Sequence, residues 1–346
     1  MASRLLDLGT CVCRLDAPEG VWAVMRHYVS PFVVAETGLR SHLTVVVERD
    51  PAGVAEARHI LTAQPATAVR TSHPRQRYRV WTAGNGETLL PNSVPDHVIT
   101  RTPGLVSIAA EHTDVAATVG TRVVRQLIMR GGEAQGGRSV HSAAVDIGGR
   151  GVLVTGHPGS GKTTVFTHLI EEHGAHPVSN DRTILVPTHP GRWNAVGVPL
   201  AARFTPEGMS GSPLLAGALD RLEPTRGRHL VDGKVELTPG ELASLVNRPF
   251  VPIAEVALIA VLTRTPPSPI QDEGFLRRHL DFGAEDFFAD DWLDLSRQLE
   301  GPTDTPNSCD ELWDRLAGDV PRLSLTWTDP TELPNIASCI HTRVRR

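Results

Sequence analysis

The first third of the chain contains short apolar runs bounded by polar residues. Residues 42–48 and 77–82 are rich in valine and aromatic side chains, which favour strands, so a strand is expected at each place. Gly84-Asn85-Gly86 separates the second run from a third at 87–90. A short glycine-containing connection between two such runs predicts a β-hairpin.

One stretch of this region has the spacing of a helix instead. Between Asp114 and Met129 the apolar side chains recur every three or four residues, at Val115, Val119, Val123, Val124, Leu127 and Ile128. That period places them on one face of an α-helix. The glycine pairs at 131–132 and 136–137 follow, and such glycine-rich sequence predicts a flexible join after the helix.

Strands and helices also follow one another in the rest of the chain. A helix is expected from Thr163 to His173, and the prolines at 266–269 break the chain. Apolar or alternating runs predict strands at 151–155, 177–186 (with a polar centre), 249–262 and 322–327. Two further segments are amphipathic, 290–299 and 308–316. We therefore expect three regions: a mixed α and β region at 1–135, a core at 136–265 and a C-terminal extension at 266–346.

Composition restricts the class of protein. The chain has 346 residues, enough for two domains, and its net charge of −5 contains no long run of one sign, which argues against nucleic acid as a partner. No apolar run approaches ~18 residues, so no membrane-spanning helix is expected. No secretory signal is visible either. We expect a cytoplasmic protein, and the preference for arginine over lysine is typical of a GC-rich bacterial genome.

The four cysteines indicate neither a metal site nor a redox pair. Cys11 and Cys13 are separated by one residue, whereas a C-x-x-C pair needs two, and Cys309 and Cys339 are isolated. Reduced structural thiols are therefore expected.

The strand at 151–155 and the helix from Thr163 enclose the motif that carries the chemistry. Residues 156–163, Gly-His-Pro-Gly-Ser-Gly-Lys-Thr, fit the phosphate-binding P-loop pattern G-x-x-x-x-G-K-[ST], and a strand before it with a helix after it is the required context. Only two lysines occur among the 34 lysines and arginines, and one of them is Lys162. A compact ammonium is therefore favoured here over the wide fork of arginine.

This motif predicts how a nucleotide triphosphate is bound. Glycines let backbone N–H groups converge on phosphate oxygens, and the following helix adds its positive N-terminal end. Lys162 is expected to reach the β- and γ-phosphates, and the Thr163 hydroxyl to hold Mg²⁺. A glycine-rich turn that matches by chance is the alternative. The expected ligands are ATP and Mg²⁺, bound by Gly156, Pro158, Gly159, Ser160, Gly161, Lys162, Thr163 and Thr164.

The stretch from His141 to Ile184 resembles the bacterial HPr kinase/phosphorylase family. Members typically show a histidine, a short strand with an aspartate, a glycine turn, and a strand leading into the P-loop. The matching positions here are His141, Asp146, Gly149, Gly151, Thr155 and the motif at 156–163. The resemblance implies an α/β P-loop core related to the phosphoenolpyruvate carboxykinases. Because the family tends to form closed oligomers, it also leaves a homo-oligomer open.

Two departures from the family pattern indicate a divergent member. Where the family has two aspartates after the P-loop helix, this chain has Asn180-Asp181, and an amide does not accept a proton at neutral pH. The resemblance therefore assigns the base role, and a role in Mg²⁺ binding, to Asp181, whose structural alternative is to cap a turn. The family's later Glu-Ile-Arg-Gly-Leu-Gly signature is replaced by residues 194–203, which contain no carboxylate. Some divergent members phosphorylate peptides or small molecules.

Other candidates have weaker support. The resemblance places His141 near the transferred phosphoryl group, although a histidine before a strand is commonly structural. Asp146 is expected to pair with a backbone group at the strand turn. A basic loop at 226–234 ends in the second lysine, Lys234, and either closes over the γ-phosphate or forms a plain hairpin. Arginines that could clamp phosphate or substrate are Arg182, Arg203, Arg226 and Arg228.

Together these residues predict an ATP-dependent phosphotransferase with Asp181, His141 and Lys162 as its catalytic residues. Its acceptor is expected to be a hydroxyl group of a peptide, a protein or a small molecule. Asn180 and the missing carboxylate favour an alternative, a nucleotide-gated binding or regulatory protein with little or no kinase activity. Decarboxylation like that of phosphoenolpyruvate carboxykinase would need a second metal site, for which no suitable residue set is visible.

Overall fold

The computed structural model describes residues 1–35, 38–73, 76–216, 230–231, 233–264, 274–282, 286, 288–299 and 309–346. The chain forms two compact units. Unit 1 contains Met1–Ala134 and Gly283–Gly301, and unit 2 contains Gln135–Phe282 and Pro302–Arg346. Both units combine helices with mixed sheets, so the expected α/β class is confirmed at that level. The division differs from the three regions expected from sequence, because the segment from 283 to 301 belongs with the N-terminal residues.

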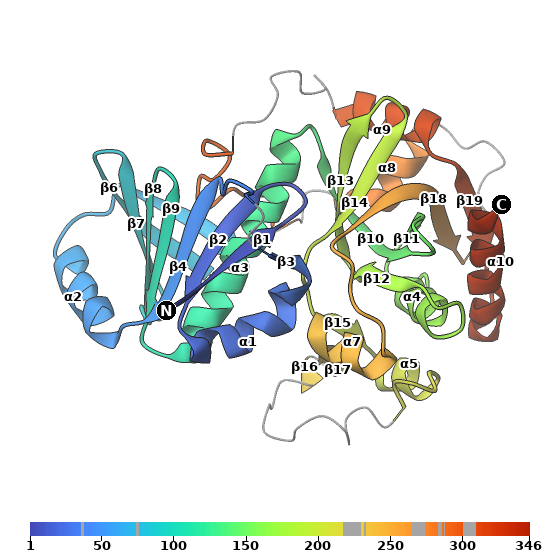
Figure 1. Cartoon of the computed structure of the whole chain (residues 1–346), viewed down its shortest axis with the longest axis horizontal. Coiled ribbons are helices and arrows are strands. Elements are labelled where there is room, and N and C mark those ends of the chain that lie inside the picture. The colour runs from blue at the N-terminus through green and yellow to red at the C-terminus, as the bar shows by residue number, and fades with distance from the viewer. Residues whose placement is uncertain are drawn as a thin grey trace. The chain divides into compact units, whose positions relative to one another are not determined.

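Unit 1 is built on a nine-stranded sheet in the order β3-β1-β2-β4-β9-β8-β7-β6-β5 (Figure 1). β2, β4 and β9 run parallel, and the remaining neighbours run antiparallel. The strands are β1 (Ala2–Asp7), β2 (Val12–Ala17), β3 (Val33–Val34), β4 (Leu43–Arg49), β5 (Ala68–His73), β6 (Gln76–Ala83), β7 (Gly86–Pro91), β8 (His97–Thr102) and β9 (Leu105–Ala110). The expected hairpin is confirmed, since β6 and β7 pair from Tyr78↔Pro91 to Ala83↔Gly86.

Helices cover this sheet. α1 and α3 pack against each other and against β4, and α2 packs on β8 and β9. In β4 the alternate side chains Leu43, Val45 and Val47 are buried, as the period of two in a strand requires. The helices are α1 (Glu19–Val29), the 3-10 turn η1 (Ser30–Phe32), α2 (Pro51–Thr62) and α3 (Thr113–Ala134).

α3 corrects the expectation of a flexible join at Gly131-Gly132, because the helix continues through both glycines to Ala134. A β-carbon at Gly131 would lie 2.9 Å from the Thr10 hydroxyl oxygen, and that hydroxyl donates to the Ile128 carbonyl at 3.0 Å. Glycine is therefore needed here for close packing. This packing outweighs the roughly 1 kcal/mol by which glycine disfavours a helix.

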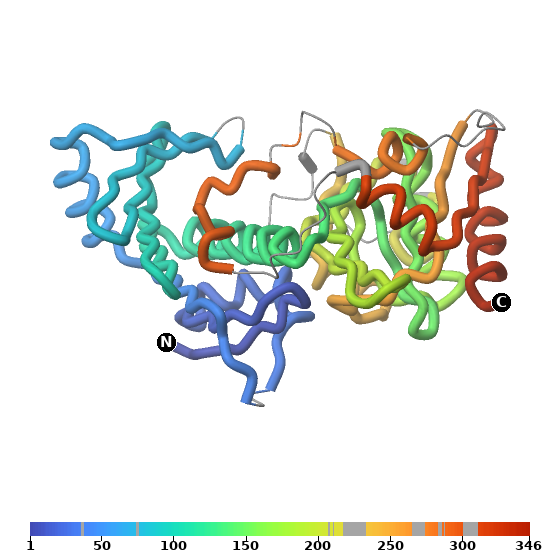
Figure 2. The backbone as a smooth tube through the Cα atoms, turned by 90° about the horizontal axis from the view of Figure 1, so that it is seen from above, coloured from blue at the N-terminus to red at the C-terminus, as the bar shows by residue number. Residues whose placement is uncertain are grey.

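The returning segment 288–299 lies against unit 1 (Figure 2). Its described residues form turns, in which buried and exposed side chains are mixed. Leu293 and Leu295 are fully buried, and the Trp292 ring stacks on Tyr78 with centroids 5.0 Å apart. Arg130 of α3 donates to the carbonyls of Ala289 and Phe288 at 2.9 and 3.1 Å. Packing against the sheet and α3 therefore holds this segment.

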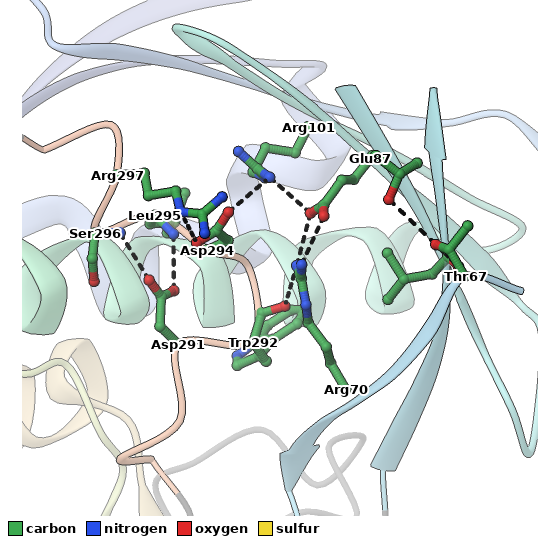
Figure 3. Close-up of polar contacts among 12 residues, drawn as sticks. Thr67, Arg70, Glu87, Arg101, Asp291, Trp292, Asp294, Leu295, Ser296 and Arg297 are labelled. Carbon is green, nitrogen blue, oxygen red and sulfur yellow. Dashed lines mark hydrogen bonds and ion pairs between the residues drawn. The ribbon is translucent and has the colours of Figure 1, made fainter. Parts of the chain in front are cut away.

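A group of four charged side chains joins the segment to the sheet, and we call it the Glu87 network: Arg70, Glu87, Arg101 and Asp294 (Figure 3). The two guanidinium nitrogens Nη1 and Nη2 of Arg70 each lie 2.7 Å from an oxygen of Glu87. Arg101 Nη2 lies 2.8 Å from Glu87 and 3.2 Å from Asp294. Each oxygen of Glu87 therefore has an arginine partner.

Unit 2 contains a seven-stranded sheet, in which the order β11-β10-β13-β14-β18-β19 is closed on itself by a parallel β11–β18 pairing and β12 pairs with β10. A separate three-stranded sheet has the order β15-β17-β16. The strands are β10 (Arg138–Asp146), β11 (Gly151–Thr155), β12 (His176–Ser179), β13 (Arg182–His189), β14 (Arg192–Gly197), β15 (Ala202–Phe204), β16 (Leu230–Val231), β17 (Lys234–Leu237), β18 (Ile253–Thr263) and β19 (Arg322–Thr326).

Two apolar clusters hold the strands and helices of unit 2 together. One includes β11, α4 and α10, and Figure 1 shows these two helices side by side. The other contains side chains of α8 and α9. The helices are α4 (Lys162–Glu171), α5 (Pro206–Ser210), α7 (Pro239–Val246), α8 (Phe275–Leu280), α9 (Cys309–Asp319), the 3-10 turn η4 (Pro330–Glu332) and α10 (Leu333–Arg345).

The strand expected at 177–186 is two strands. β12 ends at Ser179 and pairs with β10, and β13 begins at Arg182 and pairs with a different part of β10. The polar centre of the pattern, Asn180-Asp181, is the break between them. The expected strands at 151–155, 249–262 and 322–327 are confirmed as β11, β18 and β19. The proline break at 266–269 lies outside the described residues.

Three cysteines agree with the expectation of reduced thiols. Cys11, Cys13 and Cys339 are unpaired, and burial raises the pKa of Cys11 to about 12. The side chain of Cys309 lies outside the described residues. None of the described helices combines the length and apolar character needed to cross a membrane.

Candidate functional site

The motif at 156–163 connects β11 to α4 by a tight turn, which we call the glycine loop (156–161). β11 is buried along its whole length, and α4 begins at Lys162. Gly156 has a φ of 146°, and a β-carbon there would lie 2.6 Å from the Ser160 hydroxyl oxygen. Only glycine fits this position. The strand, loop and helix expected from sequence are therefore present in that order.

The ammonium of Lys162 points back onto the glycine loop. Its Nζ donates to the carbonyl oxygens of Gly156 at 2.7 Å and His157 at 3.3 Å, and the residue is only 9% exposed. Burial lowers the pKa of Lys162, while the nearby charge of Asp181 acts in the opposite direction. Among the described residues, no carboxylate lies within ion-pair distance of this ammonium. Its charge is therefore held mainly by carbonyl dipoles.

The C-terminal elements of unit 2 hold the loop from another side. The indole N–H of Trp327, just after β19, donates to the Ser160 carbonyl at 2.7 Å. A β-carbon at Gly161 would lie 3.0 Å from the Leu333 side chain of α10. The Ser160 hydroxyl is buried without a hydrogen-bond partner among the described residues. A buried hydroxyl in this position is costly unless it gains a partner.

Asp181 and His141 form a pair near Lys162. His141 lies on β10 and Asp181 in the break before β13, and their Nε2 and Oδ1 atoms are 3.3 Å apart. Burial acts to raise the pKa of Asp181, but the hydrogen bond and charge of His141, with the charges of Arg182 and Lys162, lower it below the ordinary aspartate value. Asp181 is therefore a carboxylate at neutral pH. The three predicted catalytic residues, Asp181, His141 and Lys162, therefore lie near one another.

An aromatic side chain that the sequence analysis missed orients this pair. Phe282, just after α8, stacks on the His141 ring with centroids 5.1 Å apart. The Arg182 guanidinium lies over the Phe282 ring, 3.7 Å from its centroid, and donates to the Ser139 hydroxyl at 2.8 Å. Phe282 therefore contacts the residue that holds Asp181. It is distant in sequence and belongs to no motif, so no signal in the sequence indicated it.

His279 is a second residue that the sequence did not indicate. Its ring packs against His157 of the glycine loop, with centroids 4.6 Å apart, and its backbone carbonyl accepts from the Thr155 hydroxyl. Its Nδ1 atom is buried and has no partner among the described residues. Burial, with the charges of His157, Arg278 and Lys162, lowers the pKa of His279 to about 4. The imidazole beside the loop is therefore neutral at physiological pH.

A cleft of about 650 Å³ opens beside the glycine loop. Of the residues predicted to bind the nucleotide, it is lined by Gly159, Ser160, Gly161, Lys162, Thr163 and Thr164. Gly156 and Pro158 belong to the loop but do not line this cleft, nor do His141 and Asp181. The cleft also contains side chains that sequence reasoning only weakly indicated, Arg203 of β15 and Lys234 of β17, and one that it missed, Trp327.

The remaining candidates have structural partners or lie outside the described residues. Asn180 donates from its amide to the Ala201 carbonyl at 3.2 Å. Asp146 accepts from the Gly149 N–H at 3.2 Å, which confirms the backbone pairing expected at this turn. His157 is exposed on the loop. The candidate clamps Arg226 and Arg228 lie outside the described residues.

The donors around the loop are of the kind that Mg²⁺ prefers. Thr163 offers a half-buried hydroxyl, and the Asp181 carboxylate keeps 52% of its side-chain surface exposed. Mg²⁺ is commonly bound through one or two protein oxygens, with waters and substrate phosphates completing the shell. Among the described residues, no cluster of three or more His, Cys, Asp or Glu side chains could hold a metal ion. The residues present therefore fit a magnesium ion that arrives with phosphates.

Comparison with known proteins gives only distant likeness. No protein-family model matches the chain, and no curated protein matches it. Among solved structures, it is similar to "Structure of the Hpr(Ser) kinase/phosphatase from Coxiella burnetii", with 16% sequence identity and a TM-score of 0.24, over 39% of this chain and 71% of that chain. A TM-score this low assigns neither fold nor function, so the interpretation of the site depends on the residues of this chain.

Proposed function

We propose that this protein is an ATP-dependent phosphotransferase with a P-loop core of the HPr kinase type, which moves the γ-phosphoryl group of ATP to a hydroxyl acceptor. The observation that carries the proposal is the buried Lys162 ammonium. It is held at the glycine loop by two carbonyl oxygens, beside an Asp181–His141 pair. A cation without a paired carboxylate, at the N-terminus of a helix, favours an anionic ligand.

In this proposal the loop and helix bind the triphosphate. The backbone N–H groups of the glycine loop and the N-terminus of α4 point toward phosphate oxygens, and Lys162 exchanges its carbonyl partners for the β- and γ-phosphates. The buried Ser160 hydroxyl gains a phosphate oxygen as its partner. Thr163 and Asp181 would hold Mg²⁺, which neutralises phosphate charge when it is bound.

Asp181 orients the acceptor hydroxyl. The acceptor oxygen forms a bond to the γ-phosphorus, the bond from that phosphorus to the β–γ bridging oxygen breaks, and ADP leaves. The hydroxyl proton passes to the Asp181 carboxylate. A carboxylate with a lowered pKa is a weak base, which suits a reaction whose transition state requires little prior proton removal. His141 keeps the carboxylate in place, and Phe282 keeps His141 in place.

The acceptor class follows from the resemblance of the P-loop region to divergent HPr-kinase-like proteins. A serine hydroxyl of a peptide or protein, or the alcohol of a small molecule, is the acceptor we propose. The experiment incubates the protein with Mg²⁺–ATP and panels of serine-containing peptides and small alcohols. It measures ADP release and the mass of each acceptor.

The proposal expects ADP release that rises with one acceptor, together with a product heavier by one phosphoryl group. Asp181→Asn should abolish that dependence while nucleotide binding persists. ADP release that no acceptor changes, with no phosphorylated product, would overturn the phosphotransferase assignment.

One observation favours a second candidate function, a nucleotide-gated regulatory protein. Asn180 occupies the position where the family has its first aspartate. Its side-chain amide donates a hydrogen bond to the Ala201 carbonyl, which is a structural role. Such a protein would bind Mg²⁺–ATP and release little ADP under any condition. Asn180→Asp separates the two candidates. It should raise the rate of phosphotransfer only if Asp181, His141 and Lys162 already support the reaction.

A further inference from the structure

The described side chains that line the 650 Å³ cleft beside the glycine loop are all neutral or basic. Three of them are cations, Lys162, Arg203 and Lys234, and no aspartate or glutamate is among these described residues. Hydroxyl groups line much of the remainder, at Ser160, Thr163, Thr164, Thr167, Thr205, Ser212 and Thr331. Cations and hydroxyls without a lining carboxylate create a positive potential inside a cleft, which favours a polyanion.

The three cations come from different elements. Lys162 begins α4, whereas Arg203 and Lys234 lie on the neighbouring strands β15 and β17 of the small sheet. Arg203 Nε is 3.1 Å from Glu236 Oε1, so its charge is partly neutralised. Lys234 is exposed, and it forms no ion pair with another described residue. Of the two cations on the small sheet, Lys234 therefore has its charge more available to a ligand.

Residue choice supports the same conclusion. The chain uses lysine only twice among its 34 lysines and arginines, and both lysines line this cleft. A lysine ammonium is a compact point charge on a flexible stem, and it can follow a phosphate group that arginine's planar fork would have to meet in a fixed geometry. The two lysines are separate in sequence, so no single motif accounts for both.

We propose that Lys234 is a second phosphate-binding cation of the nucleotide site, acting on the triphosphate from the small sheet while Lys162 acts from the glycine loop. This inference rests on the proposed function, because it assumes that the cleft takes a nucleotide. It adds a residue outside the P-loop motif to the site. It also predicts that the contribution of Lys234 to nucleotide affinity increases with the number of phosphates on the nucleotide.

The first test is titration calorimetry with Mg²⁺–ATP, Mg²⁺–ADP and AMP. Lys234→Met keeps most of the length of the side chain and removes its charge. It should weaken ATP binding about tenfold, corresponding to about 1.4 kcal/mol, weaken ADP binding less, and leave AMP binding unchanged. Lys234→Arg should recover part of the loss. Arg192→Ala, which removes an exposed cation of β14 in the same unit, is the control and should bind all three nucleotides like the wild type.

The second test uses the scarcity of lysine. An amine-acylating reagent followed by mass spectrometry reports on Lys162 and Lys234 separately, with the amino terminus as an internal reference. Mg²⁺–ATP should slow acylation of the exposed Lys234 several-fold and leave the reference unchanged, and AMP should give no protection of Lys234.

The outcomes distinguish this inference from the function on which it rests. If the wild type binds no nucleotide, both fail. If the wild type binds and Lys162→Met loses binding, but Lys234→Met matches the wild type for ATP and Lys234 is not protected, only the role of Lys234 is overturned. An equal loss for ATP, ADP and AMP in Lys234→Met would also overturn it, since that pattern indicates general damage to the cleft.

Discussion

Two groups of charged side chains, one in each unit, differ in how their charges are balanced. In the Glu87 network both carboxylate oxygens of Glu87 are engaged by Arg70 and Arg101 at 2.7 to 2.8 Å, and Asp294 adds a second carboxylate to Arg101. At the glycine loop the Lys162 ammonium contacts two backbone carbonyls, and Asp181 pairs with His141 rather than with the lysine.

The difference indicates which group is structural and which awaits a ligand. A network whose charges are mutually paired gains little from binding another ion. Removing one member of such a network leaves its partners as unpaired charges. A cation held mainly by carbonyl dipoles can exchange them for an anion at small cost. The Glu87 network therefore stabilises the packing of the segment 288–299 on the sheet, whereas the charge of Lys162 remains available to bind a ligand.

The largest effect is expected for Lys162→Ala. Turnover, measured as kcat/KM from ADP release, should fall about 10³-fold, because one preorganised charge on the transferred phosphates is lost. Thermal unfolding should occur at or above the wild-type temperature, since a buried cation without a paired carboxylate does not stabilise the fold. Full activity in this variant would contradict the claim that the charge of Lys162 acts on a bound ligand.

Glu87→Ala should have the opposite profile. It leaves Arg70 and Arg101 without their shared carboxylate, so the free energy of unfolding in urea should fall by about 3 kcal/mol. Turnover of the protein that remains folded should be unchanged. The matched control is Glu19→Ala, whose carboxylate is 74% exposed and pairs with Arg4 at 3.0 Å. An exposed pair of this kind contributes less than about 1 kcal/mol, so equal losses in the two variants would contradict our interpretation.

Phe282→Leu should lower kcat about tenfold and leave the KM for ATP unchanged. The ring contacts both His141 and Arg182, and each such contact is worth about 1 kcal/mol, so removing both loosens the residue that holds Asp181. Phe282→Tyr keeps the ring and should retain most of the activity. If the tyrosine variant were as impaired as the leucine variant, the ring would not be what positions His141.

The smallest effect at neutral pH is expected for His279, whose contribution to stability changes only as the pH falls. His279 has a pKa of about 4 in the folded protein and 6.5 as its ordinary value. As the pH falls below 6.5 the unfolded chain takes up this proton first, so the folded protein loses stability down to about pH 4. His279→Gln should remove that part of the loss, measured as the slope of unfolding free energy against pH. An unchanged slope between pH 6.5 and 4 would show that His279 is not held neutral beside the loop.

Local pattern was sufficient for much of the fold. The hairpin at Gly84–Gly86, the strand β4 and the β11–loop–α4 sequence were expected, because each follows from a period or a motif within a few residues. Patterns failed where tertiary packing outweighs them. Gly131 stays helical because Thr10 occupies the space that a side chain would need, and the polar centre Asn180-Asp181 splits a strand.

The sequence by itself determined the glycine loop, Lys162 and Thr163, because phosphate binding by converging N–H groups is a property of consecutive residues. It could not determine which distant side chains surround that loop. Phe282, His279, Trp327 and Lys234 belong to no shared pattern. His279 and Trp327 contact the loop, Phe282 contacts His141, and Lys234 lines the cleft beside the loop. Contacts between residues far apart in the chain arise when the core packs, and that packing is what only the tertiary structure decided.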